Sequence, residues 1–112
     1  MSITNETMKS YKFLNDMYQD SYFPKNLVEK GEKILIQLCL EIEKTKPENL
    51  EDLYKLTHAS TEKFNSLAEE FEAADSEIET AARDCIGMDF QAIAEAYGFS
   101  ADSEELIATR DW

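Results

Sequence analysis

Apolar residues recur three and four positions apart through most of this 112-residue chain, and only three glycines and two prolines interrupt them. Residues at that spacing fall on one side of an α-helix, which turns once in about 3.6 residues. The longest such face is formed by Leu27, Val28, Gly31, Ile34, Leu35, Leu38, Cys39 and Ile42. No segment alternates apolar and polar residues between turn signals, as a half-buried strand does. The sequence therefore predicts an all-α fold.

Prolines and a polar cap mark the ends of the predicted helices. Pro24 suits the first turn of a helix, and Pro47 stops one because the residue before a proline avoids helical geometry. Asn49 is a favourable N-cap for the helix that follows. The predicted helices cover about residues 6–19, 24–45, 49–74 and 76–97.

The last predicted helix has specific start and stop signals. Ser76-Glu77-Ile78-Glu79 matches the Ser-x-x-Glu capping box, in which the hydroxyl and the carboxylate each satisfy a free N–H, so this helix should begin at Ser76. Gly98 stands where a left-handed residue commonly ends a helix. A tail over residues 98–112 contains one short helical turn, and its apolar residues could dock on the other helices.

These elements predict one domain, residues 1–112, built as a compact antiparallel bundle of three long helices. A short N-terminal helix and the docked tail complete it. Antiparallel packing of the last two long helices would place residue 62 near residue 88 or 89. Cys39 and Cys85 lie among apolar residues of the helical pattern, so we expect buried thiols.

The chain carries 24 acidic and 11 basic residues, a net charge of −13. A surface of that sign repels phosphate backbones and anionic lipids, which argues against nucleic-acid and membrane partners. It could attract a basic protein or a divalent cation, although solubility alone also explains it. The sequence has neither a signal-peptide pattern at its start nor a run of about 18 apolar residues, so we expect a cytoplasmic protein.

One polar stripe could carry chemistry. It contains the only histidine of the chain, and its residues follow one another at offsets of 0, 4, 7, 11 and 14. They are His58, Glu62, Asn65, Glu69 and Glu72. Thr57 and Thr61 lie beside the stripe on the inward face of the same helix. The same spacing would also arise on the hydrated edge of any amphipathic helix.

Asp89 is the most anomalous residue, because it projects among Ile78, Ala82, Cys85 and Ile93. A carboxylate there is costly unless a hydrogen bond or a cation meets it. Two interpretations remain open. Asp89 could form a structural hydrogen bond to a Tyr, Thr or basic side chain, or it could approach His58 and Glu62 in an oxygen-rich site for a divalent metal. No other cofactor is predicted.

Several stretches resemble a bacterial family that is catalogued as a domain of unknown function. They include Tyr11-x-Phe13-Leu14, Tyr22-Phe23-Pro24, Leu53-Tyr54-x-Leu56-Thr57-His58, Ser76-Glu77-Ile78-Glu79-Thr80, Asp89-Phe90, Tyr97-Gly98-Phe99 and Arg110-Asp111-Trp112. The resemblance extends over nearly the whole chain. It implies a small, acidic, cytoplasmic helical protein, and it brings no activity and no functional residue with it.

The charge and the absence of catalytic motifs favour a non-enzymatic interaction module, whose acidic surface meets a basic protein partner or a second copy of the chain. Trp112 and Arg110 are the expected contact residues. A small enzyme or a metal- or ligand-binding bundle using His58, Glu62 and Asp89 is one alternative. An inhibitor of the immunity or antitoxin type, directed at a basic partner, is another.

Overall fold

The computed structural model describes residues 2–112, and within them the chain forms six helices and no strand. The three long helices are α3 (Lys25–Thr45), α4 (Leu50–Ala73) and α5 (Thr80–Ala96). The three short ones are α1 (Glu6–Lys9), α2 (Asn15–Gln19) and α6 (Ser103–Leu106). The predicted all-α fold is confirmed.

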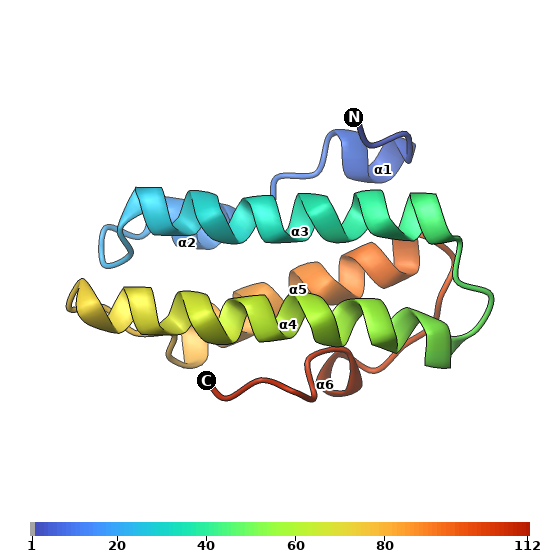
Figure 1. Ribbon diagram of the computed structural model, residues 1–112. Coiled ribbons are helices and arrows are strands. Elements are labelled where there is room, and N and C mark those ends of the chain that lie inside the picture. Colours follow the sequence, from blue (N-terminus) through green and yellow to red (C-terminus); the bar gives the residue numbers. More distant parts are fainter. Residues whose placement is uncertain (1) are drawn as a thin grey trace.

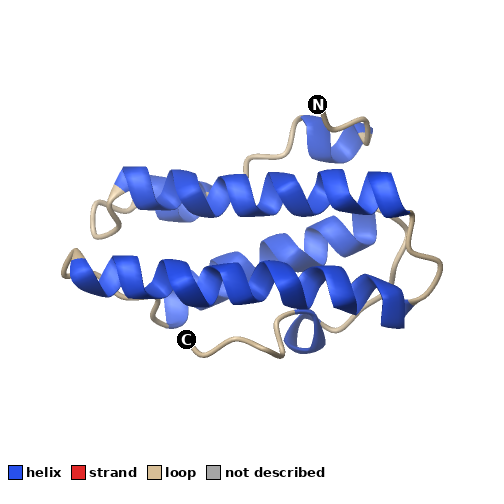
Figure 2. Cartoon of the chain, in the orientation of Figure 1, coloured by secondary structure: helices blue, strands red, loops and turns tan. Residues whose placement is uncertain are grey.

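The long helices α3 and α4 run antiparallel along each other, and α5 crosses behind them (Figure 1). Helix α1 packs against α5, α2 packs against α3 and α5, and α6 contacts both α4 and α5. Loops and turns join these elements, as Figure 2 shows. Leu106 and Ile107 are buried, so the predicted docking of the tail is confirmed. Within residues 2–112, no helix has both the length and the apolar composition that crossing a bilayer requires.

Local signals place most helix ends correctly. The side chain of Asn49 accepts a hydrogen bond of 2.9 Å from the N–H of Asp52 at the start of α4. Lys46 adopts a left-handed conformation with φ 51° and ends α3 before Pro47. Gly98 has φ 87° after α5, as its position predicted. These ends depend on residues that are neighbours in the sequence.

The predicted helix over residues 6–19 is wrong, because the chain breaks between α1 and α2. Met8 and Met17 are nine positions apart, or about two and a half turns, so a continuous helix would point them to opposite sides. The break allows both to be buried. Leu14, with φ 55°, adopts the left-handed turn that starts α2.

The predicted helix start at Ser76 is also wrong. Asp75 has φ 60°, and the N–H of Ser76 bonds to the carbonyl of Phe71 at 2.8 Å. That bond belongs to a Schellman turn, which ends α4. The Ser76 side chain is buried and its Oγ donates to the carbonyl of Tyr22 at 3.3 Å, so it caps nothing. Helix α5 therefore begins only at Thr80.

Helix α4 packs along α3 more closely than along α5. Gly31 makes this approach possible, since a Cβ atom there would lie 2.8 Å from Leu14 Cδ1 and 3.1 Å from Phe64 Cε1. Helix α4 meets α5 through side chains, with the rings of Phe64 and Phe90 6.0 Å apart. The predicted antiparallel register of the last two long helices placed residue 62 near residue 88 or 89. Because α4 packs mainly along α3, that register does not locate the candidate site.

Candidate functional site

Part of the predicted polar stripe on α4 binds the C-terminal segment, residues 103–112. His58 Nε2 lies 2.7 Å from the carbonyl oxygen of Glu105, and Nε2 carries the hydrogen because a carbonyl only accepts. The Thr61 hydroxyl donates to the carbonyl of Thr57 at 2.8 Å and lies farther, at 3.3 Å, from the carbonyl of Leu106. In return, Thr109 Oγ1 donates to the carbonyl of His58 at 3.3 Å. These contacts hold the segment along the helix.

Asn65 makes the most specific contact in this strip. Its Nδ2 donates to the carbonyl of Thr109 at 3.1 Å, and its Oδ1 accepts from the N–H of Asp111 at 3.0 Å. One side-chain amide thus pairs with a carbonyl and an N–H of the segment's backbone, as another peptide group would. His58, Thr61 and Asn65 therefore recognise backbone rather than a particular side chain.

Trp112 and Arg110, the expected contact residues, are both engaged within the chain. The Trp112 ring packs against Phe64 with centroids 6.1 Å apart, and its carbonyl accepts a hydrogen bond of 3.2 Å from Arg83 Nε. Its indole Nε1 is buried and has no hydrogen-bond partner among the described residues. Arg110 forms an ion pair of 3.1 Å with Glu104. Both residues are half-buried rather than free.

The other residues of the predicted site separate from this strip. Thr57 is buried, and its hydroxyl lies 3.3 Å from the carbonyl of Tyr54 one turn earlier. Glu62, Glu69 and Glu72 are exposed. The stripe thus divides into a part that binds the chain's own backbone and a part that faces solvent.

Asp89 binds the N-terminal part of the chain, whereas His58 binds the C-terminal segment. Its carboxylate accepts bonds of 2.6 Å from both the Tyr11 hydroxyl and the N–H of Leu14, which precedes α2. Only 5% of Asp89 is exposed, and this burial raises the pKa of its carboxyl, although the two hydrogen bonds act to lower it. Burial likewise raises the pKa of Tyr11. Of the two interpretations, the structure supports the structural hydrogen bond to a tyrosine.

The three residues considered for a divalent metal site face different surroundings in the structure. Within residues 2–112, no three His, Cys, Asp or Glu side chains come together in a group that could hold a metal ion. His58 faces Glu105, Glu62 faces solvent, and Asp89 faces Tyr11. The register that would have joined them fails because α4 packs mainly along α3.

Both cysteines are buried free thiols, as predicted. Burial raises the pKa of Cys39 to about 12 and that of Cys85 to about 11. A nucleophilic or metal-binding cysteine must be a thiolate, so neither is a reactive group at neutral pH.

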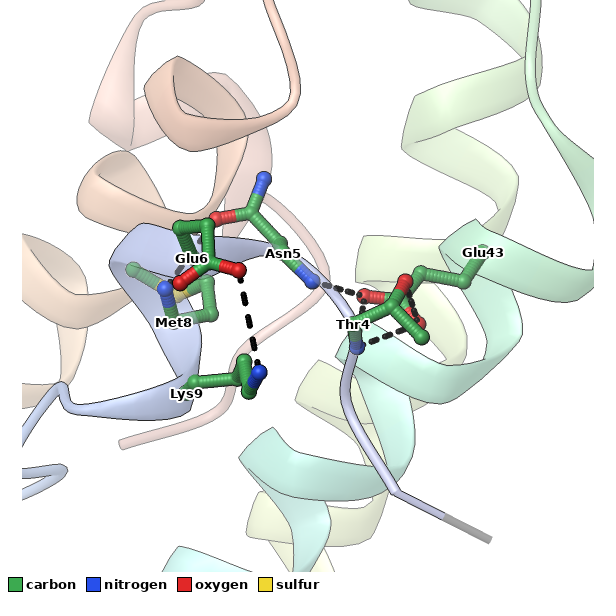
Figure 3. A network of polar contacts seen from close by, with 6 residues as sticks. All are labelled: Thr4, Asn5, Glu6, Met8, Lys9 and Glu43. Carbon is green, nitrogen blue, oxygen red and sulfur yellow. Dashed lines mark hydrogen bonds and ion pairs between the residues drawn. The ribbon is translucent and has the colours of Figure 1, made fainter.

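Sequence reasoning missed Glu43, a carboxylate near the C-terminal end of α3. Glu43 accepts hydrogen bonds from the N–H groups of Thr4 and Asn5, from the Thr4 hydroxyl and from the Tyr97 hydroxyl (Figure 3 shows the first three). Burial alone would raise the pKa of Glu43, but these hydrogen bonds outweigh it and lower the pKa to about 2. Glu43 therefore fastens the start of the chain to α3 and α5.

An open pocket of about 390 Å³ lies where α4 meets the C-terminal segment. Four carboxylates from three parts of the chain line it, and no basic side chain does. Glu69 and Glu72 come from α4, Glu77 precedes α5, and Asp111 comes from the segment. Asn65, Ala68, Ile78 and Trp112 complete the lining. Among residues 2–112, none of the four carboxylates has an ion-pair partner.

Of the comparisons with known proteins, the comparison with protein families gives a match. No curated protein and no solved structure matches the chain. A model of a family of unknown function, DUF5713, matches residues 7–112, which confirms the resemblance to a family without an assigned activity. The match includes the whole strip on α4 and all residues of the acidic pocket. The chain therefore belongs to the family of unknown function DUF5713.

Proposed function

We propose that this protein is a cytoplasmic interaction module that binds a basic segment of another protein in its acidic pocket. The observation that carries the proposal is the pocket itself, which is lined by four carboxylates that have no ion-pair partner within residues 2–112. A lysine or arginine side chain is the protein group that such a pocket attracts most strongly.

The composition of the pocket favours a peptide over a small cation alone. Ala68, Ile78 and Trp112 offer apolar surface for the methylene stem of a lysine or arginine. The indole of Trp112 could also attract the cationic head through its ring face. The net charge of −13 would draw a basic partner toward the surface before contact. An inhibitor of the immunity or antitoxin type would be one special case of this proposal.

Titration with an oligolysine peptide tests the proposal. We expect binding that weakens steeply as salt concentration rises, because the contacts are ionic. Replacing Glu69 and Glu72 together by glutamine should weaken binding about twofold to thirtyfold, since each exposed ion pair contributes roughly 0.2–1 kcal/mol and two are lost.

Glu62→Gln is the matched control, because Glu62 is an exposed carboxylate on α4 that does not line the pocket. It should change the affinity by less than about twofold. An equal loss of binding free energy per removed charge in the control and in the double variant would mean that net charge, not the pocket, attracts the peptide. No binding by the native chain at low salt would contradict the proposed function.

A further inference from the structure

We propose that residues 108–112, here called the closing segment, form a movable wall of the acidic pocket, so that docking of this segment and binding of a basic partner strengthen each other. This inference rests on the proposed function and adds a regulatory step to the same site. Asp111 and Trp112 belong to the closing segment, and both line the pocket. An undocked closing segment would leave the pocket without these two residues.

The C-terminal segment has a fixed part and a weakly held part. Leu106 and Ile107 are fully buried and anchor the fixed part. Within the closing segment, Ala108, Thr109 and Asp111 are exposed. Its attachments are mainly polar contacts at the surface, together with the half-buried ring of Trp112. Segments with few buried apolar contacts are the ones that open locally without global unfolding.

Two features oppose docking of the closing segment in the free protein. The buried N–H of Trp112 has no acceptor among the described residues, which costs free energy because that group would be hydrated in the undocked state. Docking also brings the Asp111 carboxylate to a pocket that already holds Glu69, Glu72 and Glu77. Like charges repel, and a bound cation would remove this repulsion. A basic ligand should therefore favour the docked position.

Coupling between two binding events is reciprocal, so whatever weakens docking must weaken ligand binding. Arg83 offers a test of this, because its Nε donates to the Trp112 carbonyl while Arg83 itself does not line the pocket. Removing its positive charge should strengthen cation binding by simple electrostatics. The coupling instead predicts that removing Arg83 weakens cation binding.

The experiment titrates the full chain with an oligolysine peptide and follows Trp112, the only tryptophan in the sequence. In the native chain, the peptide should shift the emission of Trp112 to shorter wavelength and reduce its quenching by acrylamide. Arg83→Met should increase quenching in the free protein and weaken peptide binding about threefold to tenfold, the range expected for losing one hydrogen bond. Asn65→Ala should also increase quenching in the free protein, but because Asn65 lines the pocket its affinity does not test the coupling.

Gln37→Ala is the matched control, because Gln37 is an exposed amide on α3 whose Nε2 donates to Glu41 on the same helix. It should change neither the quenching nor the affinity, and far-UV circular dichroism should show that all three variants keep their helices. If Arg83→Met binds the peptide as tightly as the native chain or more tightly, the coupling is wrong and the proposed function stands. If the native chain does not bind the peptide, both are wrong.

Discussion

The two ends of the chain dock on different long helices, the N-terminal part on α3 and α5 and the C-terminal segment along α4, and they do so through opposite chemistry (Figure 1). Near the N-terminus, backbone N–H groups of Thr4, Asn5 and Leu14 donate to the carboxylates of Glu43 and Asp89. In the C-terminal segment, backbone oxygens accept instead from side chains, among them the neutral amide of Asn65 on α4, and one charged side chain, Arg83, donates to Trp112. Hydrogen bonds to charged groups are roughly twice as strong as neutral ones. The N-terminal part should thus be fixed, and the closing segment adjustable.

The largest expected effect comes from Asp89→Ala in the N-terminal attachment. It leaves the buried N–H of Leu14 and the Tyr11 hydroxyl without their acceptor. Stranding a buried polar group costs about 1–3 kcal/mol, so the two together should cost about 2–5 kcal/mol of unfolding free energy. Urea denaturation measures this. A loss below about 1 kcal/mol would show that Asp89 does not fix the N-terminal part.

Asp89→Asn tests the same N-terminal attachment with a side chain that cannot ionise. Asparagine can still accept from the Leu14 N–H, while its amide donates to the Tyr11 oxygen. Burial raises the pKa of Asp89 above 3.8, so ionising this carboxyl in the folded protein lowers the free energy of unfolding. The loss of stability should therefore grow as pH rises above 3.8. Between pH 4 and 7, Asp89→Asn should remove that part of the pH dependence and match or exceed the native stability. Denaturation of both proteins across this range provides the measurement.

Gly31→Ala should destabilise by about 1–3 kcal/mol, the usual range for overpacking a core. The added Cβ would meet Leu14 at 2.8 Å and Phe64 at 3.1 Å. The added methyl group would therefore disturb both the N-terminal attachment at Leu14 and the α3–α4 contact at Phe64. Gly87→Ala is a suitable control, because the nearest atom to a Cβ there is Ile107 Cδ1 at 3.5 Å. Equal thermal unfolding midpoints for the two variants would contradict this account of the packing.

Glu43→Gln should cost about 1–2 kcal/mol, since solvent screening reduces the effect of a half-buried carboxylate. The folded-state pKa of Glu43 lies near 2 rather than 4.5. Its stabilising contribution is thus complete above pH 4.5 and is lost as pH falls toward 2. Glu48→Gln, at an exposed carboxylate beyond α3, should leave this acid dependence unchanged. Thermal unfolding at several pH values distinguishes the two variants.

The smallest effect is expected at the other end of the chain. Asn65→Ala removes two hydrogen bonds from a half-exposed site and should cost about 0.5–1.5 kcal/mol. Most of the change should appear as local exposure of Trp112, before global unfolding. Comparing Trp112 emission with circular dichroism during urea denaturation measures the difference. Coincident transitions in the variant would show that the closing segment is not a separate unit.

The sequence predicted the parts of the fold that depend on neighbouring residues. Pro47, Asn49 and Gly98 act within one or two turns of helix, so their signals could be read directly. The start of α5 was misplaced because Ser76 ends α4 through its backbone, which the capping-box pattern cannot reveal. The break before α2 depends on contacts with Asp89, 75 positions away.

The candidate site was predicted less completely, for a related reason. His58 and Asn65 belong to the polar stripe that the sequence indicated, but a sequence cannot tell a stripe that binds a ligand from one that binds the chain's own backbone. Asp89 was anomalous for a physical reason, and Tyr11 belongs to one of the partner types considered for it. Glu43 carried no signal, since a glutamate near the end of a helix is ordinarily exposed.

Native-state hydrogen exchange compares the two ends in a single experiment. The Leu14 amide, which donates to Asp89, should exchange only with global unfolding, whereas the Asp111 amide, which donates to Asn65, should exchange through local opening. Oligolysine should slow exchange at Asp111 and leave Leu14 unchanged. Equal protection of the two amides in the free protein, with no response of Asp111 to the peptide, would contradict a fixed N-terminal part and a movable closing segment.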